Sequence, residues 1–272
     1  MQKMRDEQPA TPPRIDLEGT ENVRDIGGYL NARGERVRRG VFYRADNLGR
    51  LSPRGTEQAR DLGLDAVLDL RSVEELRRYP NVFAEPPEQE PRYLHFDVIG
   101  DIEPLVSRGD TIELRRLSER DETGAFLRPV ERLTAGYSAI LDERQEIFRA
   151  LFETLGRVNG RPIMYHCVAG QDRTGLVTAL LLSIAEVPTE TIAFDYGETA
   201  VYNIHRFRRE NNAERWGLPV YSPEEYRRQL CPPEAMAGTL EHLERSYGGA
   251  LGYLLQAGVP QQVLDRLRTA LL

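Results

Sequence analysis

The residues best suited to chemistry lie in one ten-residue stretch, from His166 to Gly175. It contains a cysteine, Cys167, and an arginine, Arg173, six positions later. A cysteine attacks as its thiolate, which a helix N-terminus and a nearby cation favour. A guanidinium can bind two oxygens of a phosphoryl group at once. The spacing therefore predicts attack by the Cys167 sulfur on a phosphate ester that Arg173 holds.

The residues around this pair suit a phosphate-binding loop. Backbone N–H groups of the loop can point inward, and a glycine within it permits a positive φ or a close backbone approach. We expect the loop to bind phosphate through Val168, Ala169, Gly170, Gln171 and Asp172. The hydroxyl of Thr174 could donate to the Cys167 sulfur when the thiolate leaves. For His166 we expect hydrogen bonds that orient the loop rather than proton transfer.

The leaving oxygen of the substrate needs a proton, and three aspartates are candidates for the general acid. Asp172 is the first, because it lies beside the nucleophile. Its alternative is a structural role, in which it pairs with a neighbouring arginine and stiffens the loop. Asp97 is the second candidate and Asp101 the third. Asp69 and Arg71, which end a neighbouring strand, are expected to pair with the loop as structural residues.

The cysteine-to-arginine spacing alone is a weak signal in this chain. Lys3 is the only lysine among 36 basic residues, so arginine is common everywhere. The preceding histidine, the glycine three positions after the cysteine and the following Thr-Gly pair make the signal stronger. The alternative is a buried cysteine that acts as a small apolar side chain, which the polar neighbours of Cys167 disfavour.

The stretch lies between two elements that would position it. Pro162 to Tyr165 reads as a short buried strand, and Leu176 to Ile184 reads as a core helix that ends before Pro188. Ligands of open α/β sheets bind beyond the carboxyl ends of the strands. A helix N-terminus at the same place offers free N–H groups and a positive dipole end to an anion.

Further strands and helices alternate along the chain, which predicts an α/β fold with a central, mostly parallel sheet flanked by helices. Strands are expected at 41–44, 66–71 and 93–97. Helices are expected after Ser52, after Ser72 (with Glu75 as a capping box), over 130–158 and over 260–271.

The rest of the chain predicts one phosphatase domain, 14–272, after a disordered tail at 1–13. Residues 100–122 read as an irregular surface loop, and 200–248 as a charged helical insertion that could form a lid.

The composition excludes several classes of protein. A formal net charge of -7 leaves no global basic field for nucleic acid. No apolar run is long enough to span a membrane, and the N-terminus has no apolar signal segment, so a cytoplasmic location is expected. A leaderless export route would leave no trace in the sequence. The two cysteines are too few for a disulfide framework or a four-cysteine zinc site, and Cys231 reads as a bystander. Without a cluster of metal-ligand residues, we expect no metal and no cofactor.

The motifs together resemble the bacterial tyrosine/serine protein phosphatases of the tyrosine-phosphatase-like superfamily. Residues 166–175 resemble the signature HCxAGKDRTG of that family, and 22–29 resemble N-x-R-D-x-G-G-Y. Segments 43–48 and 68–75 resemble two further motifs, and the matches extend to the C-terminal region. The resemblance implies a tyrosine/dual-specificity phosphatase-like fold, a cysteinyl-phosphate intermediate and Asp172 as the general acid. It also implies phosphotyrosine and phosphoserine protein substrates, with phosphoinositides in some members, and a mobile two-helix lid in others.

One position departs from the family pattern. Gln171 stands where the family commonly has lysine, so this chain lacks one positive charge that could face additional phosphates. We therefore expect weaker activity on highly phosphorylated inositides. Two other functions compete: a non-catalytic phosphate-binding module that uses the same loop, and sulfur transfer. The presence of a nucleophile, a phosphate clamp and an acid disfavours the first, and the Asp172 to Gly175 run disfavours the second.

Overall fold

The chain folds around a five-stranded sheet with the order β1-β2-β5-β3-β4. The computed structural model describes residues 12–85, 90–100, 129–157, 159–210, 212 and 220–272. The strands are β1 (Arg24–Asp25), β2 (Phe42–Ala45), β3 (Ala66–Asp69), β4 (Arg92–His95) and β5 (Ile163–His166). Only β1 is antiparallel to its neighbour, and the other three pairs are parallel. The expected mostly parallel sheet is confirmed, with β5 at its centre.

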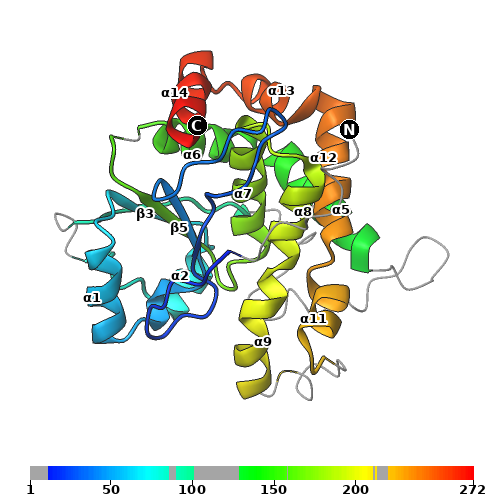
Figure 1. The fold of residues 1–272 in the computed structure, drawn as a ribbon. Helices are drawn as coiled ribbons and strands as arrows, with labels where there is room; N and C mark the ends of the chain where they lie inside the picture. The colour runs from blue at the N-terminus through cyan, green and yellow to red at the C-terminus, as the bar shows by residue number, and fades with distance from the viewer. Residues whose placement is uncertain (1–11, 86–89, 101–128, 158, 211, 213–219) are drawn as a thin grey trace.

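Helices cover both faces of the sheet. They are α1 (Pro53–Asp61), α2 (Val73–Arg78), α5 (Pro129–Glu143), α6 (Gln145–Leu155), α7 (Asp172–Ile184), α8 (Thr189–Gly197), α9 (Thr199–Arg209), α11 (Pro223–Leu230), α12 (Pro233–Tyr247), α13 (Gly249–Gln256) and α14 (Gln261–Leu271), together with the short 3₁₀ helix η1 (Leu48–Arg50). In Figure 1, α7 and α8 lie between the sheet and the pair α5 and α12, while α1 covers the opposite face.

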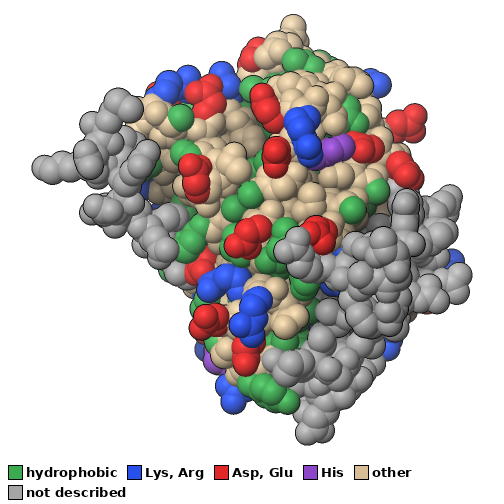
Figure 2. Space-filling model, turned by 90° about the vertical axis from the view of Figure 1, so that its right-hand side faces the viewer, with side chains coloured by type: hydrophobic (Ala, Val, Ile, Leu, Met, Phe, Trp, Pro, Cys, Tyr) green, Lys and Arg blue, Asp and Glu red, His purple; other side chains and the backbone are tan. Residues whose placement is uncertain are grey.

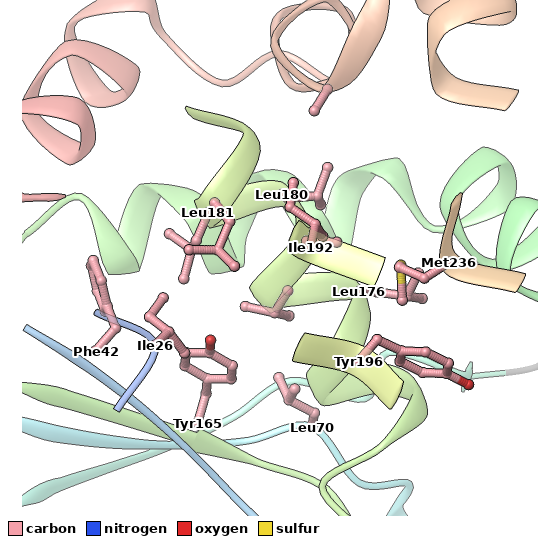
Figure 3. Packing of buried hydrophobic residues seen from close by; sticks show 14 of the residues in the cluster. Ile26, Phe42, Leu70, Tyr165, Leu176, Leu180, Leu181, Ile192, Tyr196 and Met236 are labelled. Atoms are coloured by element: carbon pink, nitrogen blue, oxygen red, sulfur yellow. The ribbon is translucent and has the colours of Figure 1, made fainter. Parts of the chain in front are cut away.

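The alternation of side chains along the strands divides the interior into two cores. Phe42, Leu68 and Tyr165 enter the larger core, under α7, whereas Val67 and Met164 enter the smaller core, which includes Ala59 of α1. Figure 3 shows the larger core, with Phe42, Leu70 and Tyr165 on the side of the sheet facing Leu176, Leu180 and Leu181 of α7. The expected core helix is therefore fixed firmly above β5.

The helix starts agree with the signals in the sequence. Ser52 caps α1 by accepting a hydrogen bond from the Gly55 N–H, and Pro53 occupies the first helical position. Ser72 and Glu75 form the expected capping box at the start of α2. Both serines follow the carboxyl end of a strand or the turn after it, so these caps bring helix N-termini toward the same edge of the sheet.

The helical structure expected over 130–158 is confirmed, and it consists of two helices with a break between them. Arg144 lies between α5 and α6 with φ -112° and ψ 28°, outside helical geometry. Its guanidinium instead donates to the carbonyl of Asp97, at 2.9 Å. The apolar pattern did not reveal the break because Ile140 and Leu151, on either side, enter the same core.

Three expectations concern regions that the structure describes only in part. Residues 1–11, and all but the first residue of the expected loop at 100–122, lie outside the described residues. The charged segment 200–248 contains most of α9 together with α11 and α12, and α9 packs beside α11. Its role as a lid stays a prediction, as does the disordered tail.

Two features of the described residues concern surface charge and helix length. The face in Figure 2 carries basic and acidic side chains interspersed, without a continuous basic stripe among its described residues. Within the described part of the chain, none of the helices combines the length and apolar character needed to cross a bilayer.

Candidate active site

The stretch singled out in the sequence forms a loop between β5 and α7, at the carboxyl edge of the sheet. The neighbouring strands β2 and β3 end on either side of it. Leu70, just after β3, donates its N–H to the His166 carbonyl at 2.9 Å, and Asn47, after β2, donates to the Val168 carbonyl at 3.1 Å. The two neighbouring strand ends thus hold the loop in place.

Every carbonyl of the loop from Cys167 to Gln171 accepts a hydrogen bond. His166 Nδ1 donates to the Cys167 carbonyl (3.0 Å), and the Asn47 N–H donates to the Val168 carbonyl (3.1 Å). The Ala169 carbonyl accepts from Asn22 Nδ2 and Asn203 Nδ2 (2.9 and 3.0 Å), the Gly170 carbonyl from Arg44 Nη2 and Asn22 Nδ2 (2.7 and 3.1 Å), and the Gln171 carbonyl from the Gly175 N–H (2.7 Å). A trans peptide points its carbonyl and its N–H in opposite directions. Each loop amide therefore points away from the donor that binds the carbonyl of the same peptide.

The amides of Val168, Ala169, Gly170 and Gln171 donate to no acceptor among the described residues. Gly170 permits the tight turn of the loop. Its φ is +64°, and a Cβ at this position would lie 2.7 Å from the Ala45 carbonyl oxygen. With the N-terminus of α7 beside them, these amides are suited to bind an anion such as phosphate.

Cys167 lies at the start of this loop, buried between the end of β5 and the start of α7. The Thr174 hydroxyl is also buried and has no hydrogen-bond partner among the described residues, so it does not bond to the Cys167 sulfur in this structure. Its donation to a leaving thiolate stays a prediction.

Arg173 is held by a carboxylate that the sequence analysis placed only in a helix cap. Its two terminal nitrogens donate to Glu75 Oε2 and Oε1 at 2.5 and 2.8 Å, in bidentate geometry. Glu75 also accepts the N–H of Ser72 at 2.7 Å, which completes the capping box. Burial would raise the pKa of Glu75, but the charge and hydrogen bonds of Arg173 lower it further, so the carboxylate stays ionised. The sequence carried no local signal for this pairing, because the two residues are brought together only by the fold.

Asp172, the first candidate for the general acid, is the first residue of α7 and is half-buried. The hydroxyl of Tyr137, from α5, donates to its Oδ1, and Gln171 Nε2 lies 3.3 Å from the same oxygen. The Tyr137 hydroxyl also bonds that of Tyr196 at 2.6 Å. The sequence placed Tyr137 on the apolar face of a helix, and its ring is indeed buried, but its hydroxyl fixes the position of the Asp172 carboxylate.

Asp97, the second candidate, lies after β4 and has a local structural contact. Its Oδ1 accepts the Gly100 N–H at 2.7 Å, in a turn. Among the described residues no contact joins the Asp97 carboxylate to the loop. Asp101, the third candidate, lies outside the described residues.

His166 and Asp69 form a buried pair beneath the loop. His166 Nε2 lies 3.2 Å from Asp69 Oδ2 and 2.8 Å from Asn81 Nδ2. Arg71 binds the same carboxylate at 2.6 Å. Burial would raise the pKa of Asp69, but His166 and Arg71 hold it well below its usual range. These contacts fit the orienting and structural roles expected of the three residues.

The side chain of Gln171 points toward α11 rather than into the anion site formed by the loop amides. Its side chain is buried, with Nε2 donating to the Leu230 carbonyl at 2.8 Å and Oε1 accepting from the Tyr226 hydroxyl at 3.2 Å. Both partners belong to α11. The departure from the family lysine therefore links the loop to a helix of the charged 200–248 segment, a role that the sequence analysis did not foresee.

Two further features of the described residues concern metal ligands and the second cysteine. No group of three or more His, Cys, Asp or Glu residues there could hold a metal ion. Cys231 follows α11 and is fully buried, and burial raises the pKa of its thiol. It is a poor nucleophile, in line with its expected role as a bystander.

Comparison with known proteins covers almost the whole chain. A model of the tyrosine phosphatase family matches residues 15–272. A triple specificity protein phosphatase, PtpB, from Mycobacterium tuberculosis is 29% identical over 280 residues, covering 94% of this chain and 98% of that protein. A tyrosine-protein phosphatase from Nostoc commune is 25% identical over 240 residues, covering 85% of this chain and 74% of that protein. On the family match and its extent, the chain belongs to the tyrosine phosphatase family.

Proposed function

We propose that this protein hydrolyses phosphate monoesters of proteins, phosphotyrosine above all, through a cysteinyl-phosphate intermediate. The observation that carries the proposal is the loop itself. Its carbonyls from Cys167 to Gln171 all accept hydrogen bonds, its amides from Val168 to Gln171 have no acceptor among the described residues, and Cys167 and Arg173 lie at its two ends. Such a preorganised cradle stabilises the charge of a transferring phosphoryl group without having to rearrange.

In the first half-reaction the loop amides and Arg173 bind the phosphoryl oxygens. The Cys167 thiolate attacks phosphorus, a sulfur–phosphorus bond forms and the bond to the ester oxygen breaks. The electron pair of that bond leaves on the oxygen, and Asp172 supplies the proton that makes it a neutral alcohol or phenol. Tyr137, by bonding Asp172, positions the carboxyl group.

In the second half-reaction water attacks the phosphorus and the sulfur–phosphorus bond breaks. The Asp172 carboxylate takes one proton from the water, which returns it to its starting state. The electron pair stays on sulfur, where the N-terminus of α7 and a donated hydrogen bond from Thr174 stabilise the thiolate. Inorganic phosphate is the product, and the loop is regenerated.

The proposed substrate range rests on the family and on the side chain of Gln171. Phosphotyrosine and phosphoserine proteins are the proposed substrates, in keeping with the family. Phosphoinositides are proposed to be poorer substrates, because Gln171 carries no charge and its amide is engaged by α11. Turnover of a phosphotyrosine peptide should exceed that of a trisphosphorylated inositide at equal concentration, and the reverse order would refute this preference.

The first test measures phosphate release from p-nitrophenyl phosphate and from a phosphotyrosine peptide, with EDTA present. We expect turnover by the wild type, none by Cys167→Ser, and wild-type turnover by Cys231→Ser, the matched control. Absence of turnover in folded, reduced wild type would favour the non-catalytic phosphate-binding module. Activity that survives Cys167→Ser would show that another residue is the nucleophile.

A cytoplasmic location also stays a proposal. Fractionation of cells that express the protein, with a cytoplasmic marker enzyme followed in parallel, tests it, and recovery from the culture medium would overturn it.

A further inference from the structure

A cluster of charge lies directly behind the phosphate-binding loop. Arg24 of β1 and Arg44 of β2 are paired across the two antiparallel strands, and both side chains are 0% exposed. Asp195 of α8, 1% exposed, lies between them: its Oδ1 is 3.2 Å from Arg24 Nε, and its Oδ2 accepts from Arg44 Nη1. We refer to Arg24, Arg44 and Asp195 as the arginine platform.

The platform carries one positive charge more than it carries negative charges. Burial raises the pKa of Asp195, but the two arginines lower it further, so the carboxylate is ionised. Burial and the neighbouring Arg24 lower the pKa of Arg44, yet arginine stays protonated in proteins. No other carboxylate among the described residues contacts either guanidinium. The Tyr29 hydroxyl, the remaining polar partner of Asp195, is neutral.

An arrangement of this kind is costly for stability. Like charges placed directly opposite each other on paired strands destabilise a sheet, and a buried charge without a full partner costs several kcal/mol as an order of magnitude. Arg44 Nε has no hydrogen-bond partner among the described residues. Apolar side chains in place of the two arginines would fill this part of the core at a lower cost in free energy. The stability of the fold therefore does not account for the platform.

The contacts of the platform lead to the loop. Arg44 Nη2 donates to the Gly170 carbonyl at 2.7 Å. Arg24 donates to Asn22 Oδ1, and Asn22 Nδ2 in turn donates to the carbonyls of Ala169 and Gly170. Both arginines thus orient the two central peptide units of the loop, one directly and one through Asn22.

The surplus positive charge of the platform also matters because Glu75 largely neutralises the charge of Arg173. Glu75 forms a bidentate ion pair with it, so the pair is close to neutral. Beneath His166, the pair of Asp69 and Arg71 is likewise balanced. The platform differs from these two ion pairs because its charges do not cancel, and it contacts the carbonyls of the loop rather than its amides.

We propose that Arg44 and Arg24 are positioning residues for phosphate binding, which fix the Ala169 and Gly170 peptide units and attract the bound dianion by their surplus positive charge. This rests on the proposed function for its biological meaning, but the binding of phosphate can be measured without turnover. The arginines do not touch the substrate, and they act through the loop.

The test uses the full-length chain with Cys167→Ser, and the probe is inorganic phosphate, titrated calorimetrically. Arg44→Gln and Arg24→Gln each remove one charge, and we expect each to weaken phosphate binding about tenfold or more, given a charge within several ångströms in a low-dielectric region. Arg44→Lys keeps the charge and should retain most of the affinity. Asp195→Asn adds to the surplus, so phosphate should bind at least as tightly as to the parent.

The glutamine variants and Asp195→Asn are expected to change the phosphate affinity in opposite directions. This separates an effect of charge from structural damage, which would weaken phosphate binding in all the folded variants. The matched control is Arg268→Gln, which also removes an arginine in an ion pair with a backbone contact, on α14. Its partner carbonyl, Ile184, lies about 18 Å from the start of α7 at 1.5 Å per residue. Thermal unfolding identifies variants that fail to fold, and Arg24→Gln replaces Arg44→Gln in that case.

Phosphate affinities within threefold of the parent for both folded glutamine variants would overturn the proposal, as would an equal loss in Arg268→Gln. A wild type that binds phosphate and responds to these substitutions, but turns over no ester, would leave the platform standing and refute the proposed hydrolysis instead.

Discussion

Glu75 is a single carboxylate with two duties. One of its oxygens completes the cap of α2, and both bind the guanidinium of Arg173. The guanidinium is rigid and planar, so a bidentate partner fixes its plane as well as its position. The orientation of Arg173, the proposed phosphate clamp, is thus set by a residue that belongs to a different strand–helix unit of the sheet.

Replacing Glu75 by glutamine should therefore affect both activity and stability. Removing one partner of a buried ion pair costs about 3–5 kcal/mol, and kcat should fall because Arg173 loses its fixed orientation. Urea unfolding at pH 7 and steady-state kinetics measure the two effects. Glu74→Gln, the neighbouring glutamate in the first turn of α2, is the control, and equal losses in both variants would contradict the role.

The same ion pair predicts a pH dependence of stability. The folded-state pKa of Glu75 is lowered by Arg173. Its contribution is therefore fully present above the unfolded glutamate pKa of about 4.3, and is lost as pH falls through the lower, folded value. The difference in unfolding free energy between wild type and Glu75→Gln should be constant near neutrality and shrink below about pH 4. A difference that does not change with pH would show that Glu75 is not ionised in the folded state.

Asp172→Asn tests the general acid. It should lower kcat for a phosphotyrosine peptide by about 100-fold, within the range typical of general acid catalysis. The loss should be much smaller for p-nitrophenyl phosphate, whose leaving group needs little protonation. Asp97→Asn, the other described candidate, serves as the comparison. If Asp97→Asn shows the selective loss instead, the assignment moves to Asp97.

At the scale of elements, the loop is joined to α11 by the Gln171 side chain. Its amide bonds both the last carbonyl of that helix and the hydroxyl of Tyr226. Tyr226 in turn packs edge-to-face on Phe207 of α9, with ring centroids 5.4 Å apart. Any motion of α11 relative to the loop must first break the contacts of Gln171.

Gln171→Ala should accordingly loosen α11 without unfolding the chain. Loss of two hydrogen bonds of modest net value, about 1–2 kcal/mol together, corresponds to roughly 5- to 30-fold faster amide exchange. Hydrogen exchange followed by mass spectrometry over 223–230 is the measurement. Gln145→Ala, which removes an amide contact to Tyr247 far along the chain, is the control and should leave that segment unchanged.

Sequence reasoning recovered the elements whose signals are local. The caps of α1 and α2 and the buried strand before the loop depend on adjacent residues, and each is where the pattern predicted it. The break at Arg144 and the bonds of Glu75 and Tyr137 depend on partners far along the chain. Periodicity describes which face is buried, and does not tell which distant polar atom a buried tyrosine or glutamate will reach. For the site, the loop residues were identifiable, while the side chains that hold the loop were not.

At the scale of the whole molecule, the C-terminal helix is part of the larger core. Val263, Leu264, Leu267 and Leu271 of α14 are all buried there, and the Leu271 carbonyl accepts the N–H of Arg38. Burial of each such side chain contributes about 1.5–3 kcal/mol, whereas the net stability of a domain is about 5–15 kcal/mol. The end of the chain is therefore required for the fold that positions the loop.

Deletion of 261–272 should thus abolish cooperative unfolding, since it exposes four core side chains at once. Near-ultraviolet circular dichroism and a urea titration measure this. Leu264→Ala is the milder companion: it should cost about 2–5 kcal/mol and still leave a folded protein. A truncated chain with an unchanged unfolding midpoint would contradict the contribution of α14.

Because Glu75 binds both the cap of α2 and Arg173, its two sets of contacts form at different times during synthesis. A ribosome releases α2 long before Arg173 is made, and α8, α12, α13 and α14 of the larger core are made after both. The capping half of the Glu75 contacts can form early, while the clamp half must await β5, α7 and the core that holds them. A half-made chain thus has a finished helix cap, while the orientation of Arg173, the proposed phosphate clamp, is reached only after the core that includes α14 has formed.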